Sequence, residues 1–223
     1  MAKSSRQSSS IFAITLGVVL SSLILCDAAP LTSRNLARSS WNTTTPTPPV
    51  TTGTSGQPLA TIYPEYTSQY NGRDGAVDFD TAQGLVSRSP TNGGADISTL
   101  VTFTVGTQYG SNICQLVFDL TNPGSSASGS LKTQIFTSLA PATADAASWP
   151  NGNLRDQELG SIDLVVGGRA TWEQGSGPGA TNNGFFPCSS IAGQIYGGEI
   201  VPQGDTDEVS WTAGQDGIKI IVW

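Results

Sequence analysis

The chain has 223 residues and a net charge of −7, from 17 Asp or Glu, 10 Lys or Arg and no histidine. Without histidine, the sequence excludes Ser-His-Asp and Cys-His catalytic machinery and His-ligated zinc or copper. Within residues 59–223, six basic residues stand against sixteen acidic residues, which leaves a net charge of −10. Because a net negative charge repels phosphate backbones and anionic lipid head groups, we do not expect nucleic acid or a membrane surface as a partner.

The first 28 residues have the pattern of a secretory signal peptide. Lys3 and Arg6 precede an apolar run over residues 11–25, and small residues follow it. The run has about 15 residues, fewer than the roughly 20 that span a bilayer. We therefore expect residues 1–28 to be removed and the mature protein to be secreted into an oxidising compartment, either extracellular or the cell wall.

Residues 29–58 are rich in Thr and Pro and contain little that could be buried. This composition predicts a disordered, extended and O-glycosylated segment. Asn42 begins an Asn-Thr-Thr sequon and is the expected site of N-glycosylation. Whether residues 29–38 form a cleaved propeptide is left open by the sequence.

Residues 59–223 alternate apolar and polar side chains with a period of two, the signature of half-buried strands. The clearest runs start at Cys114 and at Ile218, and their alternation directs Leu116, Phe118, Ile218 and Ile220 towards a core. Other such runs cover residues 101–105, 131–137, 162–166, 170–172 and 209–211, whereas only residues 140–147 suggest a short helix. About eight to ten short strands separated by turn signals predict an all-β domain, an antiparallel β-sandwich of jelly-roll-like type.

The cysteines predict one disulfide. Cys26 leaves with the signal peptide, so Cys114 and Cys188 remain as an isolated pair in an oxidising compartment. A bond that closes a loop of about 75 residues contributes on the order of 4 kcal/mol in the chain-entropy model. The alternative is a pair of buried free thiols.

Carboxylates and aromatic residues suggest two kinds of carbohydrate site. A glycosidase needs two facing carboxyl groups, and Glu173, beside Trp172, and Glu199 are the candidates. A binding module needs aromatic rings on its surface, and Trp149, in an Asn/Pro/Gly loop, is a candidate together with Tyr63, Tyr66 and Tyr70. The plainer interpretation places both glutamates on wet strand faces and Trp172 in the core.

Two acidic runs, residues 74–80 and 205–208, could offer oxygen ligands to Ca²⁺. Neither run has the spacing of an EF-hand loop, and Asp is also frequent in turns because it hydrogen-bonds its own backbone. We therefore assign no metal ligand, no cofactor and no catalytic residue from the sequence.

Five short motifs occur in an order that resembles one family. They are the segments 114–120 (CQLVFDL), 186–188 (FPC), 196–202 (YGGEIVP), 207–211 (DEVSW) and 217–220 (GIKI). From about residue 98 to residue 223 the chain resembles the fungal family named for the C-terminal domain of a protein that binds a ubiquitin-like-protein activating enzyme. The resemblance implies a fungal, mostly secreted β-sandwich without an established activity, and it offers no catalytic residues.

Together these observations predict a secreted or cell-wall-associated fungal protein with a non-catalytic β-sandwich domain. The first alternative is a module that binds cell-wall polysaccharide, and the second is a glycoside hydrolase. The expected partner is a cell-wall polysaccharide or another extracellular protein, and no cofactor is expected.

Overall fold

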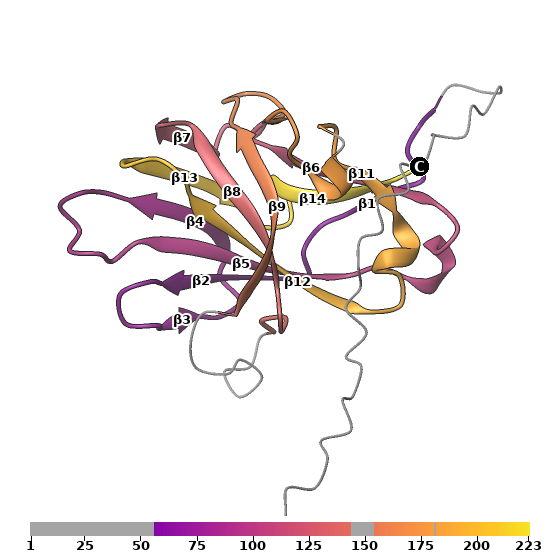
Figure 1. Ribbon diagram of the computed structural model, residues 1–223, viewed down its shortest axis with the longest axis horizontal. Helices are drawn as coiled ribbons and strands as arrows, with labels where there is room; N and C mark the ends of the chain where they lie inside the picture. Colours follow the sequence, from indigo (N-terminus) through magenta and orange to yellow (C-terminus); the bar gives the residue numbers. More distant parts are fainter. Residues whose placement is uncertain (1–55, 144–153, 181) are drawn as a thin grey trace, which may run out of the picture. The chain divides into compact units, whose positions relative to one another are not determined.

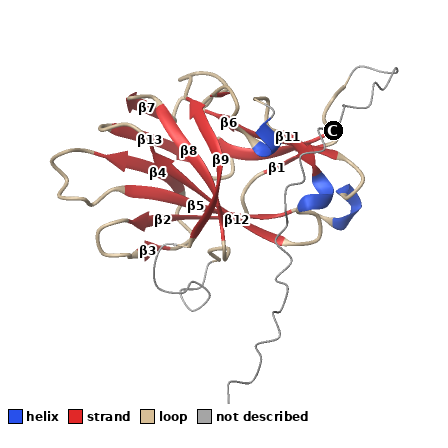
Figure 2. Ribbon diagram, in the orientation of Figure 1, coloured by secondary structure: helices blue, strands red, loops and turns tan. Residues whose placement is uncertain are grey.

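The computed structural model describes residues 56–143, 154–180 and 182–223. Residues 1–28, most of the predicted linker, Asn42 and Trp149 lie outside these ranges, so the predictions made for them stay predictions. The described chain forms strands joined by turns and by short 3₁₀ helices (Figures 1 and 2). The strands are β1 (Ala60–Ile62), β2 (Tyr66–Asn71), β3 (Val77–Asp78), β4 (Gln83–Arg88), β5 (Ile97–Thr104), β6 (Ile113–Asp119), β7 (Ser126–Gly129), β8 (Lys132–Ser138), β9 (Arg155–Asp163), β10 (Thr171–Trp172), β11 (Phe185–Pro187), β12 (Ile195–Pro202), β13 (Asp207–Thr212) and β14 (Gly217–Val222).

Two antiparallel sheets pack against each other. The smaller sheet has the order β1-β14-β6-β11. The larger sheet runs β10-β9-β8-β12-β5-β4-β13-β7, with β2 paired to β5 and β3 paired to β2. The larger sheet curls around the smaller one, so the predicted antiparallel β-sandwich is confirmed (Figure 1).

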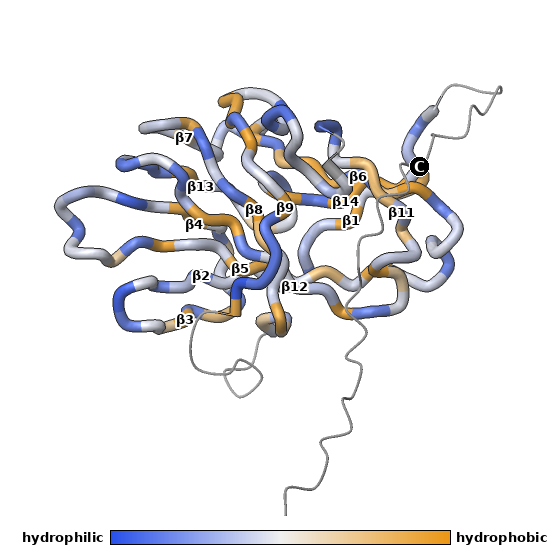
Figure 3. Tube along the Cα trace, viewed as in Figure 1, coloured by the Kyte–Doolittle hydropathy of each residue, from blue (hydrophilic) through white to orange (hydrophobic). Residues whose placement is uncertain are grey.

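The core lies between the two sheets and contains the predicted stripes. Leu116, Phe118, Ile218 and Ile220 are all buried, and β14 pairs with β6 in a register that sets Ile220 opposite Leu116. In the larger sheet, Trp211 of β13 meets Phe118 edge-to-face, with ring centroids 5.0 Å apart. Hydrophobic residues lie along β6 and β14, whereas the start of β9 and many of the turns are hydrophilic (Figure 3).

Two glycines make room for the Trp211 indole. A Cβ on Gly84 of β4 would lie 2.1 Å from the Trp211 ring, and one on Gly217 would lie 2.2 Å from its Nε1. Gly217 also has a positive φ of 77°, which other residues rarely adopt. Both positions therefore require glycine, because the largest fully buried side chain of the described core occupies the space beside them.

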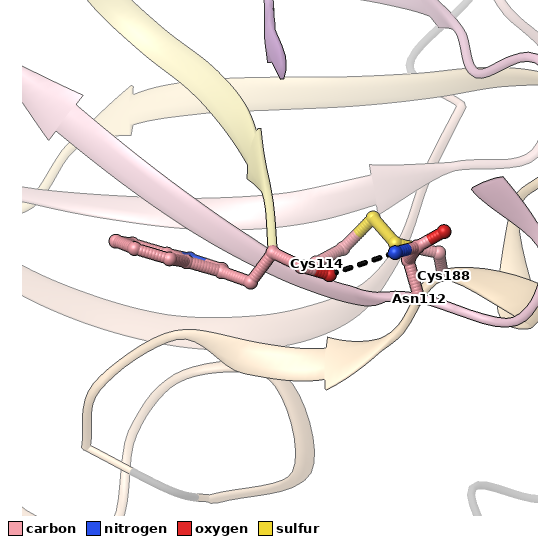
Figure 4. Close-up of a disulfide and its surroundings, with 4 residues drawn as sticks. Asn112, Cys114 and Cys188 are labelled. Atoms are coloured by element: carbon pink, nitrogen blue, oxygen red, sulfur yellow. Dashed lines mark hydrogen bonds between the residues drawn. A yellow bond between two sulfur atoms is a disulfide. The ribbon is translucent and has the colours of Figure 1, made fainter. Parts of the chain in front are cut away.

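The predicted disulfide is present and buried. Cys114 of β6 and Cys188, which follows β11, are bonded with 4.9 Å between their Cα atoms, and neither is exposed (Figure 4). Beside the bond, the Asn112 carbonyl accepts a hydrogen bond from the Cys188 amide at 3.1 Å. The Asn112 side-chain amide donates to the Trp223 carbonyl at 2.9 Å. The disulfide thus reinforces an edge at which β11 pairs with β6 over only three residues.

The structure differs from the sequence-based prediction in its short elements. More strands form than the eight to ten expected, because edge strands of two to four residues are too short to show a period. Strand β9 ends at Asp163, so residues 164–166 lie beyond it. Residues 140–143 are not helical, and the rest of the suggested helix lies outside the described ranges.

Two buried threonines provide a matched test of packing. The Thr133 hydroxyl has no hydrogen-bond partner among the described residues, whereas the Thr99 hydroxyl donates to the Leu85 carbonyl at 2.7 Å and accepts from its amide at 2.8 Å. A buried hydroxyl without a partner costs about 1–3 kcal/mol. Thr133→Val should therefore raise the free energy of unfolding by about 1 kcal/mol, and Thr99→Val should lower it by about 1–3 kcal/mol.

Urea unfolding of both variants and the wild type measures these changes. Equal destabilisation by the two substitutions would show that the Thr133 hydroxyl has a partner in solution.

Candidate functional site

Of the three candidate ligand contacts that the structure describes, Trp172, Glu173 and Glu199, the last is the most deeply buried. It lies on β12, between Leu100 of β5 and Phe136 of β8, and is 1% exposed. Arg155, the first residue of β9, binds both carboxylate oxygens through Nε at 2.9 Å and Nη2 at 2.8 Å. The Ser98 hydroxyl donates to Oε1 at 2.5 Å. Three donors from two other strands therefore hold this carboxylate.

The burial of Glu199 corrects the interpretation that places it on a wet strand face. A second apolar cluster covers this face of the larger sheet, built from Tyr70, Leu100 and Ala142 with Leu154 packed against it. A strand that is covered on both faces has no wet side, and a carboxylate there requires a paired cation or hydrogen-bond donors in place of water.

Ala142 and Leu154, which belong to this cluster, are held in place by hydrogen bonds. The Thr102 hydroxyl donates to the Ala142 carbonyl, and the Leu139 amide donates to the Leu154 carbonyl at 2.9 Å. The Arg155 guanidinium also lies over the Phe136 ring, 4.8 Å from its centroid. The guanidinium thus connects the start of β9 to both β8 and β12, a structural use of the charge.

Asp119 forms a second buried ionic network. Arg169 binds its two oxygens at 2.7 and 3.0 Å, and Lys219 of β14 binds Oδ2 at 2.8 Å. Lys219 is itself buried and lies 5.3 Å from the Tyr63 ring centroid. Burial alone raises the pKa of Asp119, but the hydrogen bonds and charges of Arg169 and Lys219 outweigh it, so the pKa falls below its ordinary value of 3.8.

Two further buried carboxylates are held by turns instead of cations. Asp207 accepts hydrogen bonds from the amides of Ser130 at 3.0 Å and Gly204 at 2.8 Å, and from the Ser130 hydroxyl. Asp216 accepts from the Asn122 amide at 3.0 Å and the Ser125 hydroxyl at 2.7 Å. Both carboxylates fasten loops to the sandwich.

Trp172 and Glu173 are adjacent in sequence but have separate roles. Trp172 is half-buried against the core, and its indole N–H donates to the Leu116 carbonyl at 3.3 Å. Glu173 forms an ion pair with Lys132, which also binds Asp163 at 3.0 Å. Glu173 and Glu199 therefore belong to different networks, and each has its own cation.

The tyrosines near the start of the domain do not form an open aromatic platform. Tyr70 is buried in the cluster that covers Glu199, and Tyr63 and Tyr66 are half-buried.

Tyr196 lines a small apolar cavity of about 30 Å³ between the sheets, together with Leu116, Ile135 and Phe186. Burial, with a smaller effect of the Asp156 charge, raises the pKa of Tyr196 to about 12, so its hydroxyl stays protonated at neutral pH.

The two acidic runs considered for calcium do not converge. Over residues 56–143, 154–180 and 182–223, no group of three His, Cys, Asp or Glu is placed to hold a metal ion. Asp207 of the second run uses its oxygens on the Ser130 and Gly204 amides instead.

Sequence reasoning found Cys114, Cys188, Glu173 and Glu199 but missed the cations that complete the ionic networks. Arg155 lies 44 residues from Glu199, and Arg169 lies 50 residues from Asp119. One feature of the sequence does indicate that Glu199 is buried: it lies in an apolar strand, directly before Ile200 and Val201.

Comparison with known proteins gives no match, either to a family model or to a curated protein. No helix in the described part of the chain is long and apolar enough to cross a membrane.

The Asp119 network predicts a loss of stability in acid. A carboxylate whose folded pKa is lowered stabilises the protein above its ordinary pKa of 3.8, and this stability is lost as the pH falls through 3.8 towards the lower folded value. Asp96 has a lowered pKa as well, so the wild type alone cannot isolate Asp119.

Asp119→Asn should be less stable than the wild type at pH 7, and the difference between the two should shrink below about pH 4. Unfolding in urea at a series of pH values measures both. A difference that stays constant across this range would contradict the assigned role.

Proposed function

We propose that this chain is a secreted or cell-wall-associated fungal protein whose β-sandwich is a non-catalytic domain. One observation carries the proposal: the four carboxylates that are buried in the described residues, Asp119, Glu199, Asp207 and Asp216, each accept at least two hydrogen bonds within the fold. These carboxylates join segments of the fold to one another. The protein acts by binding a partner or as a component of the cell wall.

The surroundings of Glu199 support this role over that of a general acid. A general acid of a glycosidase is kept protonated near neutral pH by an apolar cleft. Both oxygens of Glu199 are instead bound by the Arg155 guanidinium, and the Ser98 hydroxyl donates to one of them, so the carboxylate is engaged within the fold. Glu173 is likewise paired with Lys132 and partly open to water.

Export is supported by the signal-peptide pattern of residues 1–28 and by the single buried disulfide. The fungal assignment depends on the five motifs that resemble the family named above. The disulfide fits that proposal because its two cysteines fall within two of these motifs.

The charge distribution favours a neutral polymer as the partner. Five of the six Lys or Arg in residues 59–223 form ion pairs within the fold, and Arg73 alone among these described cations does not. The domain therefore has a net negative charge and no basic patch to attract an anionic polymer. We propose a neutral cell-wall polysaccharide as the first partner to test and another extracellular protein as the second.

We expect no hydrolysis of β-glucan, chitin, mannan or xylan by the purified protein. Reducing-sugar release over prolonged incubation is the measurement, with heat-inactivated protein as the control. Polymer pull-down in the same samples tests binding separately from hydrolysis.

Sugar release that is lost in Glu173→Gln, while the variant keeps its fold, would overturn the proposal and support a glycosidase. Glu199→Gln is the less clean test, because the substitution also weakens the contact with Arg155. Binding without sugar release would assign the domain as a carbohydrate-binding module.

A further inference from the structure

Three Asn-Gly pairs in the described chain share one local geometry. They are Asn71-Gly72, Asn92-Gly93 and Asn183-Gly184, and a fourth, at residues 151–152, lies outside the described ranges. In each of the three, the asparagine Oδ1 accepts a hydrogen bond from the amide two residues later, at 2.9, 2.9 and 3.3 Å respectively. This turn brings the side-chain Cγ close to the glycine amide nitrogen.

The three glycines differ in how freely they can react. The Gly72 amide donates to the Asp96 carbonyl at 2.8 Å, so its nitrogen is engaged. Gly184 is buried between β6 and Trp172, and its carbonyl accepts from the Leu116 amide at 2.9 Å. Gly93 is exposed in the turn between β4 and β5, and no described residue accepts a hydrogen bond from its amide.

We propose that Asn92 is a site of spontaneous deamidation in the folded protein. The Gly93 amide loses its proton to hydroxide, and its nitrogen attacks Cγ of Asn92. The Cγ–Nδ2 bond then breaks, and ammonia leaves with a proton taken from water. Water opens the resulting succinimide, which leaves an aspartate or an isoaspartate at position 92.

The local hydrogen bonds assist this reaction. The Gly94 amide donates to the Asn92 Oδ1 at 2.9 Å, which polarises the Cγ carbonyl and stabilises the negative charge that forms on this oxygen during attack. Gly93 lacks a Cβ, and the nearest atom to the place where one would stand is Arg73 Nη1 at 3.8 Å, so little obstructs attack by its nitrogen on Cγ.

Deamidation at this position would disturb a charged network at one end of the sandwich. The Asn92 Nδ2 donates to Asp96 Oδ1 at 2.9 Å, and the other oxygen of Asp96 binds Arg88 Nε at 2.7 Å. Arg88 in turn donates to the Gly204 carbonyl at 3.3 Å, which ties the turn between β4 and β5 (at the left in Figure 1) to the loop before β13. A carboxylate at position 92 cannot donate a hydrogen bond to Asp96, and it places a second negative charge beside that residue.

The test is peptide mass spectrometry of the full-length protein after incubation in mildly alkaline buffer, with fragmentation that distinguishes isoaspartate from aspartate. We expect position 92 to gain one dalton first, about tenfold or more faster than positions 71 and 183, because a hydrogen bond on the nucleophile or burial slows the other two. Conversion at either of those positions at an equal or higher rate would overturn the proposal, as would no conversion at position 92.

A parallel incubation in urea identifies the cause. When the chain is unfolded, the three sites should react at similar rates, because all three are Asn-Gly. A ranking that persists in urea would mean that the fold does not select Asn92, which also overturns the inference.

Asn92→Asp, with Asn71→Asp as its matched control, tests the consequence. Asn92→Asp should lower the melting temperature at neutral pH, and the deficit should shrink in acid as the paired carboxyl groups become protonated. Asn71→Asp keeps the oxygen that accepts from the Arg73 amide and should leave the melting temperature unchanged. An unchanged melting temperature in Asn92→Asp would contradict the role given to the Asn92–Asp96 contact.

Discussion

Burial of carboxylates in a domain with few cations is the constraint on which much of this fold depends. An ionised carboxylate away from water is unfavourable unless donors surround it. Arg169 and Lys219 stabilise Asp119, and Arg155 stabilises Glu199. Asp207 and Asp216 instead accept hydrogen bonds from turn amides and hydroxyls. Five of the six cations in residues 59–223 are paired with carboxylates, and the excess of carboxylates gives the domain its net negative charge.

The same contacts connect parts of the chain that are distant in sequence. Glu199 bonds Ser98 across 101 residues, and Asp216 bonds Ser125 across 91 residues. The disulfide joins residues 74 apart. The sandwich consists mainly of pairings between strands that are distant in sequence. These hydrogen bonds and the disulfide therefore help the apolar core to hold loops and sheet edges in place.

The fold class was predictable because alternation is a local signal. Cys114 to Leu120 and Ile218 to Val222 show it clearly, and the side chains that the alternation directs inwards are buried, although β14 is buried along its whole length. The two-residue strands β3 and β10 carry no such signal, since a period of two needs several residues to appear. The disulfide was also predictable, because the expected removal of Cys26 with the predicted signal peptide leaves one pair.

The environment of Glu199 was not predictable in the same way. Whether its strand face is wet depends on Tyr70, Leu100 and Ala142, which tertiary packing brings together. The pairing with Arg155 depends on the position of β9 beyond β8, which no local pattern encodes. Residue type alone made Glu173 and Glu199 equivalent candidates, whereas the structure gives one a buried, bidentate partner and the other an ion pair open to water.

The central claim is that the buried carboxylates hold the fold together, and a double-mutant cycle on Arg155 and Glu199 tests it most directly. Arg155→Met leaves a buried carboxylate without its cation and should cost about 3–5 kcal/mol of unfolding free energy at neutral pH. Adding Glu199→Gln should recover more than about 1 kcal/mol, which would demonstrate coupling between the two side chains. Glu173→Gln, at the partly exposed pair, should cost less than about 1 kcal/mol. Additive effects of Arg155→Met and Glu199→Gln, each under about 1 kcal/mol, would contradict the account.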